Sequence, residues 1–105
     1  MSNIIELLDT QKGYDLLYWK EKDKYKDLRH IQLHLNKMLG KISEITEPYE
    51  HGENNSLDII QKDIIPDLLI YTLHLAVRHY NYSGELEKAY RNRLSRNIRK
   101  REKLE

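Results

Sequence analysis

The feature that most constrains the fold of this chain is the spacing of its apolar residues, which recur at steps of three and four. In residues 28–47 the apolar stripe continues for about five helical turns; its members are Leu28, Ile31, Leu35, Met38, Leu39, Ile42 and Ile45. Only 4 glycines and 2 prolines occur, and no segment alternates polar and apolar residues as a half-buried strand does. The pattern therefore predicts an all-α protein.

The first half of the chain is expected to contain two helical regions. The first covers residues 4–27, with a break near Gly13, and the second covers residues 28–47. Pro48 is expected to end the second helix, because the residue before a proline avoids helical geometry.

The second half holds the one clear loop, residues 49–56, and two further helices. Ser56 is expected to be the N-cap of a third helix over residues 57–80. Pro66 lies inside that helix and should remove one backbone hydrogen bond and bend it. After a turn of sequence Asn-Tyr-Ser-Gly, the last helix covers residues 85–103. The predicted architecture is a four-helix bundle.

Length and composition set limits on the class of protein. At 105 residues the chain suits a single domain, residues 1–105, whose core is modest, so we expect a homo-oligomer that buries one face against another copy. The absence of cysteine excludes disulfides and thiolate metal sites and suits a reducing compartment. No apolar run approaches the roughly 18 residues that cross a bilayer, and no secretory signal is evident. A cytoplasmic location without a membrane partner is the expectation.

Positive charge is concentrated at the end of the chain. Residues 85–105 hold eight basic side chains and four glutamates and are net +4, so that the rest of the chain, within a total of +1, is net −3. A basic helix of this kind is typical of contact with phosphates, nucleic acid or an acidic protein surface, or of simple exposure to solvent.

The order of these parts resembles the MazG-like nucleotide pyrophosphohydrolases, members of the all-α NTP pyrophosphatase superfamily. The resemblance covers residues 28–101 and is carried by "HLNKMLGKISEI", "DIIPDLLIYTLHLA" and "ELEKAYRNRLSRNIRKR". It implies a four-helix MazG-like bundle and assembly as a dimer or tetramer. It also implies hydrolysis of a nucleoside triphosphate to a monophosphate and pyrophosphate with Mg²⁺ as cofactor.

The resemblance also implies where metal ligands would lie. The family's glutamates fall on Lys37, Met38 and Lys41, and its acidic pair falls on Ile64 and Asp67. Carboxylates at i and i+3 share one helix face, and two such pairs on facing helices would surround Mg²⁺ with oxygen. Lysine and methionine cannot replace a carboxylate for this ion. Hydrolysis is therefore expected to be lost or weakened, with Met38 packing on Ile64 and Lys41 pairing with Asp67.

Two alternatives to a site that has lost its metal remain open. A shifted Mg²⁺ site could use acids at neighbouring turns, namely Glu44, Glu47, Asp63 and Asp67. His30 and His34 have the i, i+4 spacing of a zinc pair, but no third ligand accompanies them, so a surface or interface pair is the favoured interpretation.

The last helix carries the candidate nucleotide contacts. Arg93 and Asn97 match the family's lysine and asparagine that help to bind the nucleotide, and a guanidinium can hold phosphate with two hydrogen bonds. Three classes of function follow: a MazG-like protein that binds a nucleotide or an acidic protein without hydrolysis, an active Mg²⁺-dependent pyrophosphohydrolase, or a small nucleic-acid-binding protein.

Overall fold

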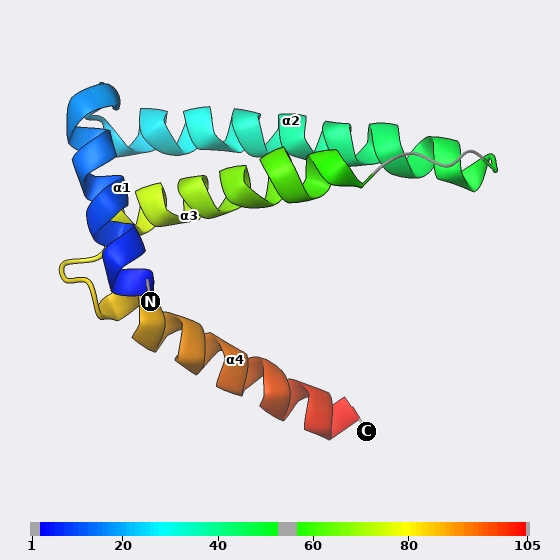
Figure 1. The fold of residues 1–105 in the computed structure, drawn as a ribbon. Coiled ribbons are helices and arrows are strands. Elements are labelled where there is room, and N and C mark those ends of the chain that lie inside the picture. The colour runs from blue at the N-terminus through cyan, green and yellow to red at the C-terminus, as the bar shows by residue number, and fades with distance from the viewer. Residues whose placement is uncertain (1–2, 53–56, 105) are drawn as a thin grey trace. The chain divides into compact units, whose positions relative to one another are not determined.

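The computed structural model describes residues 3–52 and 57–104, and this part of the chain contains helices and no strand (Figure 1). The elements in chain order are α1 (Ile4–Tyr18), α2 (Lys24–Glu50), the π-helical turn η1 (Ile60–Ile64), α3 (Ile65–His79) and α4 (Glu85–Leu104). The prediction of an all-α chain with four helices is confirmed, whereas Ser56 lies outside the described residues. No helix in the described ranges is long and apolar enough to cross a bilayer.

These elements form two compact units. The first unit comprises Met1–Leu17 and Leu73–Glu105, and the second comprises Tyr18–Thr72. The first thus contains α1 and α4 with the last turns of α3, and the second contains α2, η1 and the first turns of α3. The single-domain organisation stays a prediction.

The first helix passes the predicted break at Gly13 and ends at Tyr18, before the predicted boundary at residue 27. It starts where the backbone N–H of Glu6 donates to the Asn3 side-chain oxygen at 3.1 Å, which is an N-cap contact. It then runs through Gly13 to Tyr18, so the predicted break at Gly13 is wrong. One glycine costs a helix only about 1 kcal/mol, and the rest of the helix tolerates that cost.

The true break is set by the cap of the next helix. The Asp23 carboxylate accepts hydrogen bonds from the backbone N–H groups of Tyr25 at 2.9 Å and Lys26 at 3.1 Å. Asp23 itself is extended, with φ −77° and ψ 121°, as an N-cap residue should be. Helix α2 therefore starts at Lys24 and not at Leu28.

Pro48 does not end α2, which continues to Glu50, so this prediction is also wrong. A proline near the C-terminus removes one backbone donor without blocking the next two residues. The chain leaves the helix at Gly52, two residues after its last residue, where a φ of +85° is the left-handed conformation that glycine adopts freely. The Gly52 N–H donates to the Tyr49 carbonyl at 3.0 Å and closes the last turn.

Pro66 is accommodated by a wider turn before it. Residues Ile60–Ile64 form a π-helical turn, in which the N–H of Ile65 donates to the carbonyl of Ile60. The extra residue in this turn gives room for the proline ring, which would clash with the preceding turn of a regular helix. The predicted bend of the helix at Pro66 stays a prediction, and the structure has a change of helix type directly before the proline.

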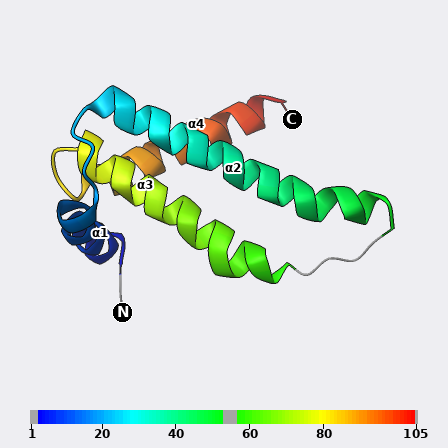
Figure 2. The same ribbon diagram turned by 90° about the horizontal axis from the view of Figure 1, so that it is seen from above.

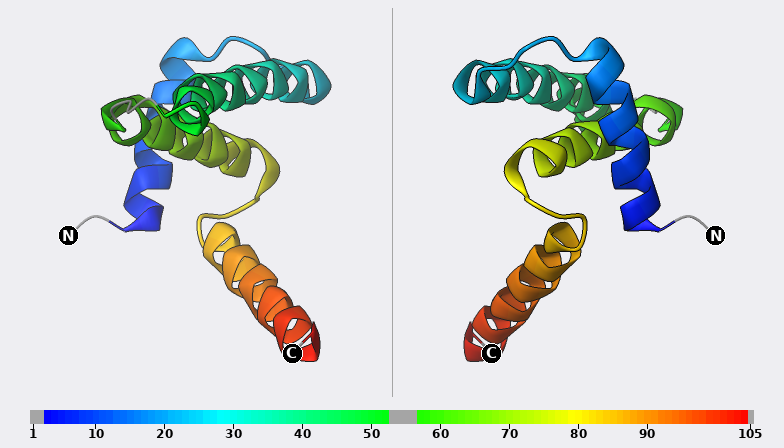
Figure 3. Two further views of the ribbon diagram at one scale, coloured as in Figure 1. Left: turned by 90° about the vertical axis from the view of Figure 1, so that its right-hand side faces the viewer. Right: turned by 90° about the vertical axis from the view of Figure 1, so that its left-hand side faces the viewer.

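In the second unit, α2 and the first turns of α3 lie side by side (Figures 1 and 2), and the pairing is also visible from both ends (Figure 3). The side chains buried in this unit are Ile31 and Met38 of α2 and Ile64 at the end of η1, together with the carboxylate of Asp27. Leu39, which the sequence pattern places on the apolar stripe, is 62% exposed. The buried face of α2 is therefore narrower than the stripe of apolar residues in its sequence.

In the first unit, α1 packs on the last turns of α3. Leu8, Leu73 and Ala76 form a small buried cluster, and the partly buried Ile4, Val77 and Leu86 pack against it. Only the start of α4 takes part, since every described side chain from residue 90 to residue 103 is exposed. Helix α4 thus presents its arginines and lysines to solvent.

Candidate functional site

Two of the positions to which the resemblance assigns metal ligands lie in the interior. Met38 is 5% exposed and Ile64 is 2% exposed, on the two segments that run side by side in the second unit. Both side chains are apolar, and a methionine thioether is a soft ligand that suits Mg²⁺ poorly. The residues at these positions therefore do not fit a magnesium ion.

The charged residues of the same set lie on the surface. Lys37, Lys41 and Asp67 are exposed, and no ion pair between Lys41 and Asp67 is formed among the described residues. Asp67 acts instead on His34, whose charged form it favours. The prediction that a Lys41–Asp67 salt bridge takes the place of the metal is therefore wrong.

The four acids of the shifted site belong to two groups. Glu44 and Glu47 line an open hollow of about 400 Å³ near the end of α2, together with Pro48 and His51. Asp63 and Asp67 are exposed on η1 and α3 and do not line this hollow. In the described part of the chain, no group of three or more histidine, aspartate or glutamate side chains is placed to hold a metal ion. A Mg²⁺ site made by these four residues stays a prediction.

The predicted nucleotide contacts, Arg93 and Asn97, lie one turn apart in α4 and are both exposed. A helical i, i+4 pair shares one face, so both side chains can reach the same ligand. On this helix an ion pair joins Arg91 to Glu87 at 3.0 Å, between two exposed side chains. Nucleotide binding by Arg93 and Asn97 stays a prediction.

A cluster of aromatic and histidine rings lies at the start of α2, and the sequence pattern predicts only part of it. His34 stacks on Tyr71, with ring centroids 5.5 Å apart and 26° between the planes, and meets His30 edge-on at 4.5 Å. Trp19 meets His30 and Tyr71 edge-on at 6.2 Å and 6.4 Å. The predicted histidine pair thus packs against aromatic rings of the same unit.

Burial lowers the pKa of His34 below its usual value of 6.5. The neighbouring His30 and Lys37 lower it further, while the carboxylate of Asp67 raises it. Beside this cluster, the indole N–H of Trp19 donates to the buried carboxylate of Asp27 at 2.6 Å, across the connection between α1 and α2. Trp19, which follows α1, is thus bound to the first turn of α2 by this hydrogen bond and also belongs to the ring cluster.

The first unit contains a buried polar network that the sequence does not reveal. Asp15 of α1 accepts a hydrogen bond from the Gln11 amide at 2.8 Å, and its other oxygen lies 2.8 Å from Nδ1 of His74 in α3. The exposed fractions are 9% for Asp15, 6% for Gln11 and 1% for His74. Because a buried polar group without a partner is costly, this network fixes α1 on the last turns of α3.

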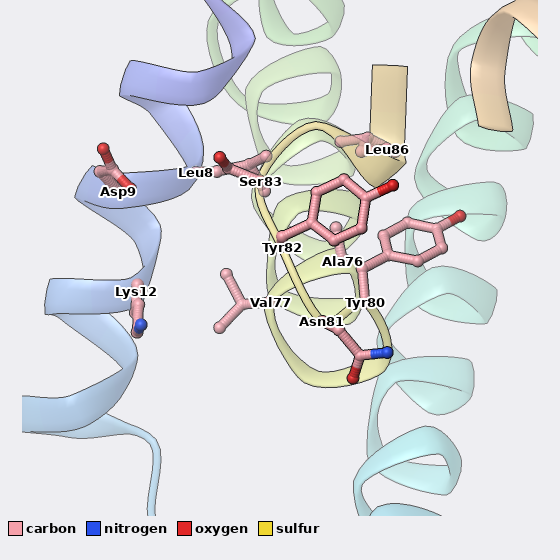
Figure 4. Close-up of a pocket in the computed structure, with 10 residues that line it drawn as sticks. All are labelled: Leu8, Asp9, Lys12, Ala76, Val77, Tyr80, Asn81, Tyr82, Ser83 and Leu86. Atoms are coloured by element: carbon pink, nitrogen blue, oxygen red, sulfur yellow. The ribbon is translucent and has the colours of Figure 1, made fainter. Parts of the chain in front are cut away.

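The first unit also contains a partly open pocket of about 190 Å³, shown in Figure 4. Its floor is apolar and continues the core cluster; it is made by Leu8, Ala76, Val77 and Leu86. Its rim is polar and comes from α1 and from the turn before α4; it is made by Asp9, Lys12, Tyr80, Asn81, Tyr82 and Ser83. The pocket combines an apolar base with polar groups at the edge, as ligand sites generally do.

Sequence reasoning missed this pocket because its residues come from three helices and one turn. The segment Tyr80-Asn81-Tyr82-Ser83-Gly84 stands out in the sequence only as a turn. The one local hint in the sequence is a pair of tyrosines that flank an asparagine. They line a pocket only because the folded chain places this turn beside α1 (Figure 4).

The resemblance to MazG-like pyrophosphohydrolases rests on the residues of the chain itself. The second unit has two facing helical segments where the resemblance expects them, and such pairs also occur in unrelated all-α folds. Comparison with known protein families, with curated proteins and with solved structures finds no match to this chain.

Proposed function

We propose that this protein is a MazG-like helical protein in which hydrolysis has been lost or weakened and which acts by binding a nucleotide. Protein binding through the basic helix α4 is the related form of the same proposal. In this proposal the protein has the helical scaffold that the resemblance implies, and binding takes the place of hydrolysis.

The observation that carries the proposal is the burial of Met38 and Ile64. Four carboxylates around Mg²⁺ would need a polar, hydrated space between the facing helices. At the corresponding positions this chain has apolar side chains that are 5% and 2% exposed. Burial of these apolar side chains stabilises the unit without an ion, because removing apolar surface from water is itself favourable.

The remaining charges support the same conclusion. Lys37 and Lys41 are exposed cations on the same helix as Met38, and positive charge near a metal site opposes the binding of Mg²⁺. Asp67 is the single carboxylate left at the five family positions, and one carboxylate cannot hold two metal ions.

The first test is pyrophosphate release from the common NTPs and dNTPs with Mg²⁺ or Mn²⁺. The proposal predicts release no faster than the background and no difference between the wild type and Asp67→Ala. Metal-dependent release that Asp67→Ala or Glu44→Ala abolishes, and that the exposed control Glu6→Ala keeps, would show an active enzyme with the shifted acidic site.

The second test is thermal stabilisation by nucleotides with and without Mg²⁺. Ligand that binds only the folded state raises the melting temperature, and the rise depends on the ratio of its concentration to Kd. The proposal predicts a rise that is the same with Mg²⁺ and with EDTA. Stabilisation that requires the metal contradicts it.

Nucleic-acid binding is a second candidate because α4 is exposed and basic. The basic side chains of residues 88–103 are all exposed, and Arg91 pairs with Glu87 of the same helix. Affinity for a single strand should then fall with log[salt] by roughly 0.7 for each phosphate contact. Replacing Arg96 and Arg99 with glutamine should lower both the affinity and this slope. Affinity that does not depend on salt would exclude the candidate.

A further inference from the structure

We propose that the pocket of the first unit binds the planar base of a nucleoside or nucleotide, at a site separate from Met38 and Ile64. This inference rests on the proposed nucleotide-binding function and names the place and the part of the ligand that is held.

The size of the pocket selects a small ring system. Its volume is about 190 Å³. A dry apolar cavity of about 150 Å³ is enough to bind benzene, whereas drug-sized ligands occupy roughly 300–1,000 Å³. One planar heterocycle therefore fits, and the sugar and any phosphate would remain at the open side.

The floor of the pocket suits the face of a ring. Leu8 and Ala76 are each 6% exposed, and Val77 and Leu86 pack against them. These side chains form the core of the first unit, so the floor exists before any ligand arrives. A preformed floor lowers the cost of binding, since little has to become ordered.

Two phenol rings stand at the rim, where they can stack on a base. Tyr80 is 37% exposed and Tyr82 is 59% exposed, and Figure 4 shows both rings on the side of the pocket opposite Asp9 and Lys12. The Tyr82 ring lies against Gly84, where an added Cβ would be 3.4 Å from its nearest carbon. A ring held in this way is ready to stack on any of the four bases.

The turn that carries these rings is fixed by its own hydrogen bonds. The Asn81 N–H donates to the Glu85 carboxylate at 3.0 Å, and the Glu85 N–H donates to the Tyr82 carbonyl at 3.1 Å. The turn is therefore held at both of its ends, and the rim does not have to be ordered by the ligand.

The rim also has polar groups that the described part of the protein does not use. Within that part, neither the side-chain amide of Asn81 nor the hydroxyl of Ser83 makes a hydrogen bond, and Lys12 forms no ion pair. An amide offers two donors and one acceptor, which is the complement that the edge of a base requires. The charges of Lys12 and Asp9 cancel, so we expect a neutral ligand group in the pocket and weak dependence on salt.

The experiment is the binding of adenosine, guanosine, cytidine and uridine, measured one at a time by calorimetry and saturation-transfer NMR. Tyr82→Ala should weaken binding by about fivefold to a hundredfold, because one stacked base is lost, and Tyr82→Phe should keep it. Tyr25→Ala is the matched control, since Tyr25 is 85% exposed on α2 and should leave the affinity unchanged. Asn81→Ala should change the order of the four affinities.

The inference is overturned if no nucleoside binds, or if Tyr82→Ala binds as tightly as the wild type. An unchanged order of affinities in Asn81→Ala overturns the role of the amide. Nucleotide binding that is insensitive to Tyr82→Ala overturns the pocket and leaves the proposed function standing. Metal-dependent pyrophosphate release overturns the proposed function and leaves the pocket untouched, because a nucleoside has no phosphate to lose.

Discussion

The facing helices of the second unit and the pocket of the first unit differ in how their space is used. Where the resemblance expects polar metal ligands, Met38 and Ile64 are buried and apolar. Where the sequence predicts nothing, a pocket with an apolar floor and uncommitted polar groups is present. The positions expected to hold a metal are occupied by buried apolar side chains, whereas the pocket that the sequence does not predict is open.

Under the proposed function, the helical scaffold of the second unit and the ligand site of the first unit are separate features of the molecule. Packing between helices depends on the volume and apolarity of the buried side chains, so carboxylates can be replaced by apolar residues without loss of the helix pair. Binding depends on polar groups that have no partner inside the protein, and these can lie on any turn that the scaffold holds still.

The largest expected effect is on the filled positions. Ile64→Ala should lower the free energy of unfolding by about 2–5 kcal/mol, because it removes buried methylene groups and leaves a cavity. The neighbouring Ile65 is 55% exposed, and Ile65→Ala should change the stability by no more than about 0.5 kcal/mol. Urea unfolding followed by circular dichroism measures both. Equal losses for the two variants would mean that position 64 is not interior, which would break the comparison.

A second contrast lies within α1, between the buried, hydrogen-bonded carboxylate of Asp15 and the carboxylate of Asp9 at the pocket rim. Asp15→Ala should cost about 1–3 kcal/mol, because Gln11 and the buried His74 each lose a partner. Asp9→Ala, at the rim of the pocket, should lie within about 0.5 kcal/mol of the wild type. The same unfolding measurement decides the matter. A loss from Asp9→Ala as large as that from Asp15→Ala would show that the rim is part of the structural network.

A smaller effect is expected from pH through His34. Its pKa is lowered in the folded state by burial and by His30 and Lys37, so the unfolded state binds its proton more readily. Stability should be complete above about pH 6.5 and should fall as the pH drops below 6.5 towards the folded pKa. Asp67→Asn should lower the pKa further, since Asp67 raises it.

The pH series needs one control and has a clear contrary result. His34→Gln should flatten the dependence, and His51→Gln, at an exposed position, should leave it unchanged. The transition midpoint in urea at each pH gives the slope, and NMR titration of the His34 ring gives the pKa. A stability that rises as the pH falls from 6.5 contradicts the assigned direction.

The smallest expected effect is on the open pocket itself. Tyr82→Ala and Ser83→Ala remove exposed groups, so each should change the stability by no more than about 0.5 kcal/mol. Thermal unfolding without ligand measures this. A loss above 1 kcal/mol would show that the rim holds the turn together and would weaken its assignment to a ligand.

The sequence predicted the fold class well because helical periodicity is a local signal. Residues 28–47 form the centre of α2, and the basic segment 85–103 forms α4, as their apolar spacing indicates. The boundaries were less predictable, since they depend on contacts made after folding. Asp23 caps α2 and Gly52 ends it, whereas Gly13 and Pro48, the residues expected to interrupt helices, do not.

The candidate sites were predictable only where they lie on one helix. The spacing of His30 and His34 is evident in the sequence, and so are the apolar replacements at positions 38 and 64. The Asp15–His74 contact joins residues that are 59 positions apart, and the pocket joins α1 to the turn before α4. No local pattern specifies such pairs, because they are created by packing.

The central claim is that ligand binds at the open pocket and not at the filled positions between the facing helices. Backbone amide shifts of the isotope-labelled protein during titration with a nucleoside monophosphate test it most directly, with and without Mg²⁺. We predict shifts at residues 8–12 and 80–86 that are the same in both conditions, and none at residues 37–41 and 63–67. Shifts at residues 37–41 and 63–67 that require Mg²⁺ would contradict the claim.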